Sequence, residues 1–153
     1  LNEKISFFNC SKNNKRKLIQ KHLLPEPRLD VGIKLLNKAE FCTDISDGLI
    51  EEISTIAHRS KKQANIFLEK IPISLATKEI LDKNINKSKQ IWEIILFGGE
   101  DYELLFSLPR KKRITSKPVK ISKIGFFSNG NGVRIFDKNG KEFPTKKRGF
   151  SHF

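Results

Sequence analysis

The stretch from residue 41 to residue 62 constrains the fold more than any other part of this chain of 153 residues. Phe41–Ile45 is short and mainly apolar, and this pattern predicts a strand. A helix follows at once, because apolar residues then recur at the helical period, namely Leu49, Ile53, Ile56 and Ala57. Acidic residues fall in its first turn and basic residues near its end, which complements the helix dipole. The chain must therefore turn from strand to helix within the few residues DISDG.

Patterns elsewhere predict further helices and strands in no strict alternation. The predicted helices are Lys15–Leu24, a segment capped by Asp30 with Val31, Leu35 and Leu36 near one face, a segment capped by Ser74 and reaching Leu81, and Ile91–Leu96. The predicted strands are Asn65–Leu68, Tyr102–Leu108, Val119–Phe127 and Gly132–Phe136. Lys83–Lys89 is predicted to be a polar loop, and Asp137–Gly140 a hairpin turn. This mixture favours the α+β class.

The net charge of +13 raises the hypothesis of a nucleic-acid-binding protein. The excess is mostly lysine, dispersed along the chain beside many isoleucines and asparagines, a composition typical of A/T-rich coding bias. The sequence contains no RNP, zinc-finger or helix-turn-helix pattern. We therefore favour a solvated basic surface, and a module that binds nucleic acid or another acidic partner stays the alternative.

Cysteine use and apolar runs bear on the cellular setting. Cys10 and Cys42 match no metal or disulfide spacing, so a reduced, cytoplasmic protein is expected. No apolar run approaches the ~20 residues that cross a bilayer, and no signal peptide is visible. The sequence contains no methionine, even at position 1, so we expect a piece of a longer protein. A domain outside the chain is then expected to contribute to any active site.

Residues 44–49, DISDGL, bring reactive side chains to the start of the predicted helix. Free backbone N–H groups and the positive end of the helix dipole form an anion site there, and Gly48 lets a phosphate approach closely. Asp44 and Asp47 offer hard oxygen ligands of the kind that bind Mg²⁺ together with substrate phosphates. The alternative is that Ser46 or Asp47 only caps the helix, which leaves Asp44 unexplained.

A second cluster, GGEDYELL, begins at Gly98 between a predicted helix and a predicted strand. Its two glycines fit an ordinary turn, whereas the adjacent Glu100 and Asp101 stand where their carboxylates can meet a cation. The terminal GFSHF places one histidine between aromatic residues, which by itself is more typical of a packed tail than of a site. The familiar glycine-rich nucleotide loops are absent from the sequence.

Taken in order, four motifs resemble one family: PEPR at Pro25–Arg28, DISDGL, GGEDYELL and GFSHF. They resemble the C-terminal half of thiamine-monophosphate kinase, of the aminoimidazole-ribonucleotide-synthetase-type superfamily, over residues 23–153. The two central motifs in this order are more specific than either alone. Residues 1–22 match no motif and are expected to be a basic N-terminal segment or linker remnant. The resemblance implies a mixed, mainly antiparallel sheet with helices packed against it.

The resemblance also implies an activity, the direct transfer of the γ-phosphoryl group of ATP to thiamine monophosphate with the help of Mg²⁺. Carried over to this chain, Asp44 and Asp47 are magnesium ligands and Ser46 contacts ATP. Glu100 and Phe150 contact the thiamine substrate, whose cationic thiazolium ring suits an aromatic face. Phosphoryl transfer depends on alignment and on neutralising cations, so no residue is assigned as a catalytic nucleophile or base.

Partners follow from the same resemblance. Family members are homodimers of two-domain chains with the active site between the domains, and this chain matches only the second domain. The fragment alone is therefore expected to be inactive. A paralogous enzyme of the superfamily, acting on another small substrate, is the enzymatic alternative. We expect no membrane partner.

Overall fold

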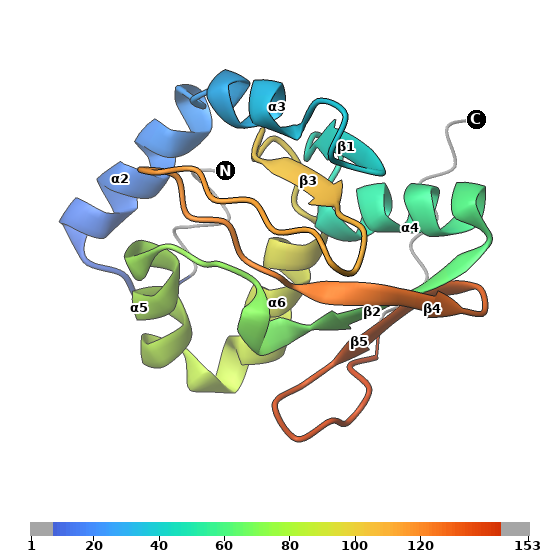
Figure 1. The fold of residues 1–153 in the computed structure, drawn as a ribbon. Helices are drawn as coiled ribbons and strands as arrows, with labels where there is room; N and C mark the ends of the chain where they lie inside the picture. The colour runs from blue at the N-terminus through green and yellow to red at the C-terminus, as the bar shows by residue number, and fades with distance from the viewer. Residues whose placement is uncertain (1–7, 145–153) are drawn as a thin grey trace, which may run out of the picture. The chain divides into compact units, whose positions relative to one another are not determined.

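The computed structural model describes residues 8–144, which fall into two compact units. The first unit combines the described residues up to Glu52 with Ile73–Ile121. The second combines Ile53–Pro72 with the described residues from Ser122 onward. Helices and strands occur in each unit, which confirms the α+β class (Figure 1).

The first unit contains most of the helices. They are α2 (Lys12–Leu23), α3 (Leu29–Leu35), α5 (Leu75–Lys83), the short 3₁₀ helix η2 (Ile85–Lys87) and α6 (Ser88–Phe97). Helix α4 (Leu49–Ser60) begins in this unit and continues into the second. Helices α3, α5 and α6 each bury two residues, four positions apart in α3 and α5 and five positions apart in α6. Helix α2 has no fully buried residue, although Leu18 and Ile19 are half-buried.

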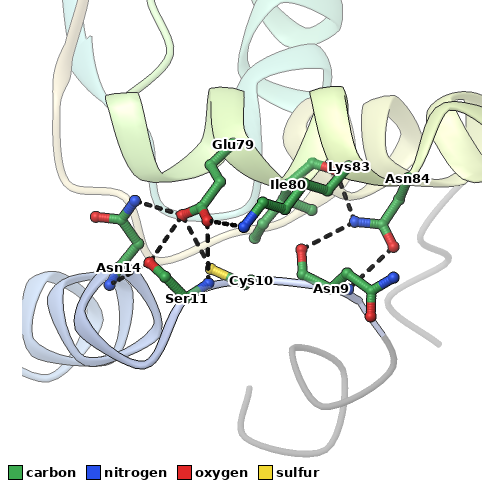
Figure 2. Close-up of polar contacts among 8 residues, drawn as sticks. All are labelled: Asn9, Cys10, Ser11, Asn14, Glu79, Ile80, Lys83 and Asn84. Atoms are coloured by element: carbon green, nitrogen blue, oxygen red, sulfur yellow. Dashed lines mark hydrogen bonds and ion pairs between the residues drawn. The ribbon is translucent and has the colours of Figure 1, made fainter.

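Polar contacts attach the start of α2 to α5 (Figure 2). The Oγ of Ser11 accepts from the backbone N–H of Asn14 at 3.3 Å and so caps α2, which is why this helix begins at Lys12 and not at the predicted Lys15. The same hydroxyl donates to the Glu79 carboxylate at 2.9 Å, and Lys83 binds that carboxylate at 2.6 Å. The bond from Lys83, followed by that from Asn14, lowers the pKa of Glu79 to about 2.

Asn84, just beyond α5, completes this connection with a buried side-chain amide (Figure 2). Its Nδ2 donates to the carbonyl oxygens of Asn9 at 3.0 Å and Ile80 at 2.8 Å. Its Oδ1 accepts from the backbone N–H of Asn9, also at 3.0 Å. The amide thus uses both its donors and its acceptor, and it pairs with the backbone of Asn9 as a neighbouring strand does.

The sheet of the first unit pairs β1 (Phe41–Asp44) with β3 (Leu104–Ser107) in antiparallel register. Phe41 lies opposite Ser107, and Asp44 lies opposite Leu104. The strand predicted at Phe41–Ile45 is therefore confirmed to within one residue. The strand predicted from Tyr102 starts two residues later, because Tyr102 has a φ of 52° and cannot belong to an extended segment.

The second unit has β2 (Lys62–Phe67) at the centre of its sheet. Strand β4 (Gly125–Asn129) pairs with one edge of β2 antiparallel, and β5 (Gly132–Phe136) pairs with the other edge parallel. The link from β4 to β5 therefore passes the beginning of β2, where Gly130 and Gly132 adopt positive φ angles. At the far end of β2, the ring of Phe67 lies 6.1 Å from that of Phe126 and 5.9 Å from that of Phe136, before the 3₁₀ helix η1 (Leu68–Lys70).

Four other expectations about helices and strands also need correction. Asp30 lies in the first turn of α3 and does not cap it, since Arg28 holds the cap position. The segment Lys83–Lys89, predicted to be a loop, contains η2 and the start of α6. The strand predicted at Val119–Phe127 is shifted to Gly125–Asn129, where β2 supplies its hydrogen-bonding partner. The strands of the described residues form two sheets instead of one, since β1 and β3 do not pair with β2, β4 or β5.

The helix predicted from Leu49, the cap at Ser74, the strand Gly132–Phe136 and the turn after it are confirmed. The Ser74 Oγ accepts from the N–H of Thr77 at 3.0 Å. In the turn, the Asp137 side chain accepts from the backbone of Asn139 and of Lys141, each at 2.9 Å, and Gly140 has a φ of 75°. No helix of residues 8–144 has the length and apolar character needed to cross a bilayer.

Candidate functional site

Backbone hydrogen bonds join the two central motifs along their length. The N–H of Ile45 donates to the carbonyl oxygen of Glu103, and the N–H of Tyr102 donates back to that of Ile45, both at 2.9 Å. The N–H of Glu100 donates to the carbonyl oxygen of Ser46 at 2.7 Å. DISDG and GGEDYE, more than 50 residues apart in the sequence, thus form one paired structure at the end of the β1–β3 sheet.

Two glycines permit this close approach. A Cβ on Gly99 would stand 2.2 Å from the carbonyl oxygen of Ser46, a distance that no side chain tolerates. Gly48 has a φ of 113°, and a Cβ there would stand 3.0 Å from the carbonyl carbon of Phe97. The glycines of both motifs therefore serve the contact between the motifs, beyond any role in letting a ligand approach.

Gly48 also takes the cap position of α4, because its carbonyl oxygen accepts from the N–H of Glu52 at 3.1 Å. The interpretation of Ser46 or Asp47 as the cap is accordingly corrected, since both precede that position. The hydroxyl of Ser46 instead donates to the Glu52 side chain at 3.4 Å. Ser46 is half-buried at the entrance to the helix.

The two predicted magnesium ligands border the same segment. Asp44 ends β1 opposite Leu104, and Asp47 approaches Gly99 closely enough that a Cβ there would stand 3.3 Å from its Cα. Both aspartates are exposed. Among residues 8–144 no group of three or more His, Cys, Asp or Glu side chains is arranged to hold a metal ion. Two carboxylates suit Mg²⁺ when phosphate oxygens supply further ligands.

Glu100, the predicted contact to the thiamine substrate, stands beside Ser46 through the backbone bond between them. Its side chain is 62% exposed, and its Oε2 lies 3.3 Å from Nε2 of His22, the next-to-last residue of α2. Its φ of 68° is unusual for a residue other than glycine. Phe150, the other predicted substrate contact, lies outside the described residues, as does the whole GFSHF tail.

Two basic residues without an assigned role from the sequence, Arg28 and Lys21, converge on Glu103 of the GGEDYE loop. Arg28 donates from Nε and Nη2 to the two carboxylate oxygens of Glu103, each at 2.8 Å. Lys21 also approaches Glu103, at 3.1 Å. The hydrogen bond from Arg28 is the main cause that lowers the pKa of Glu103 and raises that of Arg28 itself. The PEPR motif made Arg28 recognisable in the sequence, but the sequence did not show that Arg28 pairs with Glu103.

Asp101 differs electrostatically from its neighbours in the loop. Loss of solvation raises its pKa, and the negative charge of Glu103 raises it further. The positive charges of Lys21 and His22 act in the opposite direction. The loop thus combines one ion-paired carboxylate with another that is less readily ionised.

A cavity of about 520 Å³ lies in the first unit and adjoins both central motifs. Its lining residues are Pro25, Pro27, Arg28, Leu29, Gly32, Ile33, Leu36, Asp44, Tyr102 and Leu104. Most of the lining residues are apolar and come from α3 and PEPR, whereas the corner at Ser46 and Glu100 is polar. Asp44 and Tyr102 line the cavity and also belong to the two central motifs.

Comparisons with known proteins support the resemblance seen in the motifs, although no protein-family model matches the chain. Thiamine-monophosphate kinase of Buchnera aphidicola subsp. Schizaphis graminum is 39% identical over 142 aligned positions, and the match covers 89% of this chain and 42% of that protein. The kinase of Buchnera aphidicola subsp. Acyrthosiphon pisum is 37% identical and covers 98% of this chain and 47% of its own length. The chain therefore spans somewhat less than half of these curated relatives.

Solved structures agree with the sequences. The crystal structure of thiamine monophosphate kinase from Aquifex aeolicus matches with a TM-score of 0.71 and 32% identity, over 88% of this chain and 43% of that one. A structure of AaThiL complexed with AMPPCP and TMP matches with a TM-score of 0.73 and 34% identity, over 94% of this chain and 43% of that one. Along nearly its whole length, the chain is thus similar in sequence and fold to a part of thiamine-monophosphate kinase that makes up somewhat less than half of that enzyme.

Proposed function

We propose that the chain is part of an enzyme that transfers the γ-phosphoryl group of ATP to thiamine monophosphate and so produces thiamine diphosphate. The similarity to thiamine-monophosphate kinases over most of the chain supports this activity. The relative complexed with AMPPCP and TMP supports ATP and a thiamine monophosphate as the two substrates. The observation that carries the proposal in the structure is the backbone pairing of DISDG with GGEDYE, because it gathers the carboxylates and Ser46 at one corner.

The corner offers the groups that phosphoryl transfer needs. Ser46 precedes α4, where the positive end of the helix dipole favours phosphate, and we assign it to ATP. Asp44 and Asp47 are the proposed ligands of Mg²⁺, since acidic side chains near phosphates require an intervening cation. When bound, Mg²⁺ neutralises charge on the phosphates. The transfer itself needs alignment more than covalent help, so no side chain is given the role of nucleophile or base.

Substrate contacts and partners extend the proposal. Glu100 lies next to Ser46 and is assigned to thiamine monophosphate, with Phe150 against the cationic ring of the same substrate. The remaining part of the kinase is assigned to an N-terminal domain that forms the other wall of the site. The complete enzyme is proposed to be a cytoplasmic homodimer. Residues 23–153 then form its second domain, with residues 1–22 preceding that domain.

A domain-replacement chimera tests the activity. The stretch of the Schizaphis graminum Buchnera relative that matches this chain is replaced by the chain itself, and formation of thiamine diphosphate from ATP and thiamine monophosphate is measured. We expect the chimera to turn over and the chain alone to be inactive. Turnover by the chain alone, or a chimera that phosphorylates another acceptor in a substrate screen but not thiamine monophosphate, contradicts the proposal.

The metal assignment is tested in the same chimera. Asp47→Asn should reduce kcat by ~100-fold or more even in excess Mg²⁺, because it removes a ligand charge at the transferred group. The matched control is Asp82→Asn, which neutralises an exposed aspartate of α5 outside both motifs and should retain turnover. Wild-type turnover by the Asp47 variant shows the assignment to be wrong.

A further inference from the structure

The loop that carries Glu100 adopts a conformation that needs external support. Glu100 and Tyr102, two positions apart, both have positive φ angles, 68° and 52°. Residues other than glycine rarely adopt this left-handed region. Each donates its N–H to the DISDG backbone, so the strained geometry also fixes the pairing of the two motifs. The DISDG backbone thus supplies one support of this conformation, and side chains from outside the loop supply another.

The side chain of Glu103 connects the loop to Arg28, which lies outside it. Glu103 directly follows Tyr102 and directly precedes β3, so its side chain stands at the end of the loop. Arg28 donates to both carboxylate oxygens of Glu103 at 2.8 Å in a bidentate contact, the geometry that a planar guanidinium matches best. The pair is partly shielded, with side-chain exposures of 22% for Arg28 and 39% for Glu103. Because it is shielded and doubly bonded, it is stronger than an ordinary surface ion pair.

Further contacts from α2 act on the same loop. Lys21 binds Glu103 at 3.1 Å, and His22 lies 3.3 Å from Glu100. The positive charge of Lys21 also lowers the pKa of Asp101, which the negative charge of Glu103 raises. PEPR and the end of α2 thus fix the shape and reduce the charge of the loop together.

We propose that Arg28 and Glu103 are positioning residues. Their bidentate ion pair holds residues 99–103 so that Glu100 lies beside Ser46, in the orientation that receives the thiamine substrate. The proposal rests on the function proposed above, in that it assigns the pair a purpose at the same site. Neither residue needs to touch the substrate, since both act through Glu100.

The kinetic test uses the chimera with substitutions in the pair. Arg28→Gln and Glu103→Gln should each raise KM for thiamine monophosphate by ~10-fold, with kcat changed less than about twofold. The double variant should be no worse than either single variant, because the two residues form one contact. Arg28→Lys should also raise KM for thiamine monophosphate, since an ammonium group cannot make the bidentate contact. A loss of stability alone lowers the amount of active enzyme, hence the apparent kcat, and leaves KM unchanged.

The chain provides a matched control in Arg134 and Glu142, an ion pair of the second unit with contacts at 3.0 and 3.3 Å. Arg134→Gln should leave KM within about twofold of the unsubstituted chimera, because the bonds of this pair lie within the second unit. Equal effects of Arg28→Gln and Arg134→Gln, or additive effects within the Arg28–Glu103 pair, overturn the proposal.

A second measurement on the 153-residue chain alone separates this proposal from the proposed function. Arg28→Gln should speed amide hydrogen exchange at Glu100 and Tyr102 by ~10-fold, and leave Phe67, whose N–H donates to Ile124 in the second unit, unchanged. Unchanged exchange at Glu100 and Tyr102 overturns the positioning role. If Arg28→Gln does not fold by circular dichroism, Arg28→Lys is used in the same comparison. An inactive unsubstituted chimera contradicts the proposed function, while the exchange result still decides the role of the pair.

Discussion

At the scale of single residues, the two motif glycines are determined by the backbone opposite them and not by turn geometry alone. Gly99 faces the carbonyl oxygen of Ser46, and Gly48 faces the backbone of Phe97. Backbone atoms cannot move aside as a flexible side chain does, so these positions accept only hydrogen at Cα. Glycine-rich segments near a phosphate site are usually attributed to the ligand, but here the protein's own packing already requires them.

Gly99→Ala should therefore destabilise the chain by about 2 kcal/mol or more, because its Cβ overlaps the carbonyl oxygen of Ser46. Gly32→Ala is the matched control. Gly32 lies inside α3, and its nearest neighbour to a new Cβ is a Leu104 methyl group at 3.9 Å, so alanine should stabilise the helix by about 0.5–1 kcal/mol. Urea unfolding of both variants measures the difference, and equal midpoints would show that the close contact at Gly99 does not exist.

At the scale of elements, α2 shows how a helix without a buried face is held in place. None of its side chains is fully buried, in contrast to those of α3, α5 and α6, so its apolar residues give it no buried docking face. Contacts at both ends compensate. Ser11 is bound by Glu79 of α5 at the beginning, and Lys21 and His22 contact the GGEDYE loop at the end. Helix α2 thus connects α5 to the candidate site within the first unit.

The contact at Glu79 should make the stability of the chain depend on pH. The folded-state pKa of Glu79, about 2, lies below its ordinary value of 4.5. Its contribution is therefore fully present above pH 4.5 and is lost as the pH falls through that range toward 2. The difference in Tm between the unsubstituted chain and Glu79→Gln should accordingly be largest above pH 4.5 and shrink as the pH approaches 2.

Thermal unfolding followed at several pH values checks this dependence. Glu69→Gln, at an exposed glutamate of η1, serves as the control and should give a small difference in Tm at every pH. A Tm difference for Glu79→Gln that stays constant across the acidic range contradicts the assigned role of the carboxylate.

At the scale of the whole molecule, the charge and the site point to different partners. The net charge of +13 suggests a polyanion, whereas the polar corner gathers carboxylates. The basic cluster Arg110–Arg113 is not simply free to bind phosphates, because Arg113 donates to the carbonyl oxygens of Arg110 and Lys112. Dispersed lysines raise solubility and attract small anions, and neither effect requires a nucleic-acid partner.

The chain should accordingly show no retention on immobilised DNA or RNA at ~150 mM salt, and any retention at lower salt should fall steeply as salt is added. Asp44→Ala provides the discriminating variant. Retention at ~150 mM salt that survives this substitution would favour a binding module that uses the basic surface. If Asp44→Ala abolishes kinase activity in the chimera, and neither form of the chain is retained on nucleic acid, the result favours the enzyme instead.

The sequence by itself determined the elements that depend on near neighbours. The helix from Leu49, the Ser74 cap and the Asp137–Gly140 turn arise from periodicity or from side chains that bond to backbone a few residues away, and such patterns are visible in the chain. The motif order likewise indicated the relatives. The residues of the candidate site were also chosen from the sequence, and their assigned roles stay proposals.

Only the tertiary structure decided the contacts between distant segments. Arg28 and Glu103 are 75 residues apart, and no local pattern shows that they meet. The left-handed conformation of Tyr102 interrupts an alternation that predicted a strand, because the pairing with Ile45 outweighs local propensity. The strand expected from Val119 begins at Gly125 instead, where β2 offers its edge. Local chemistry fixes what a segment is able to form, and the partner that satisfies its hydrogen bonds and charges fixes what it does form.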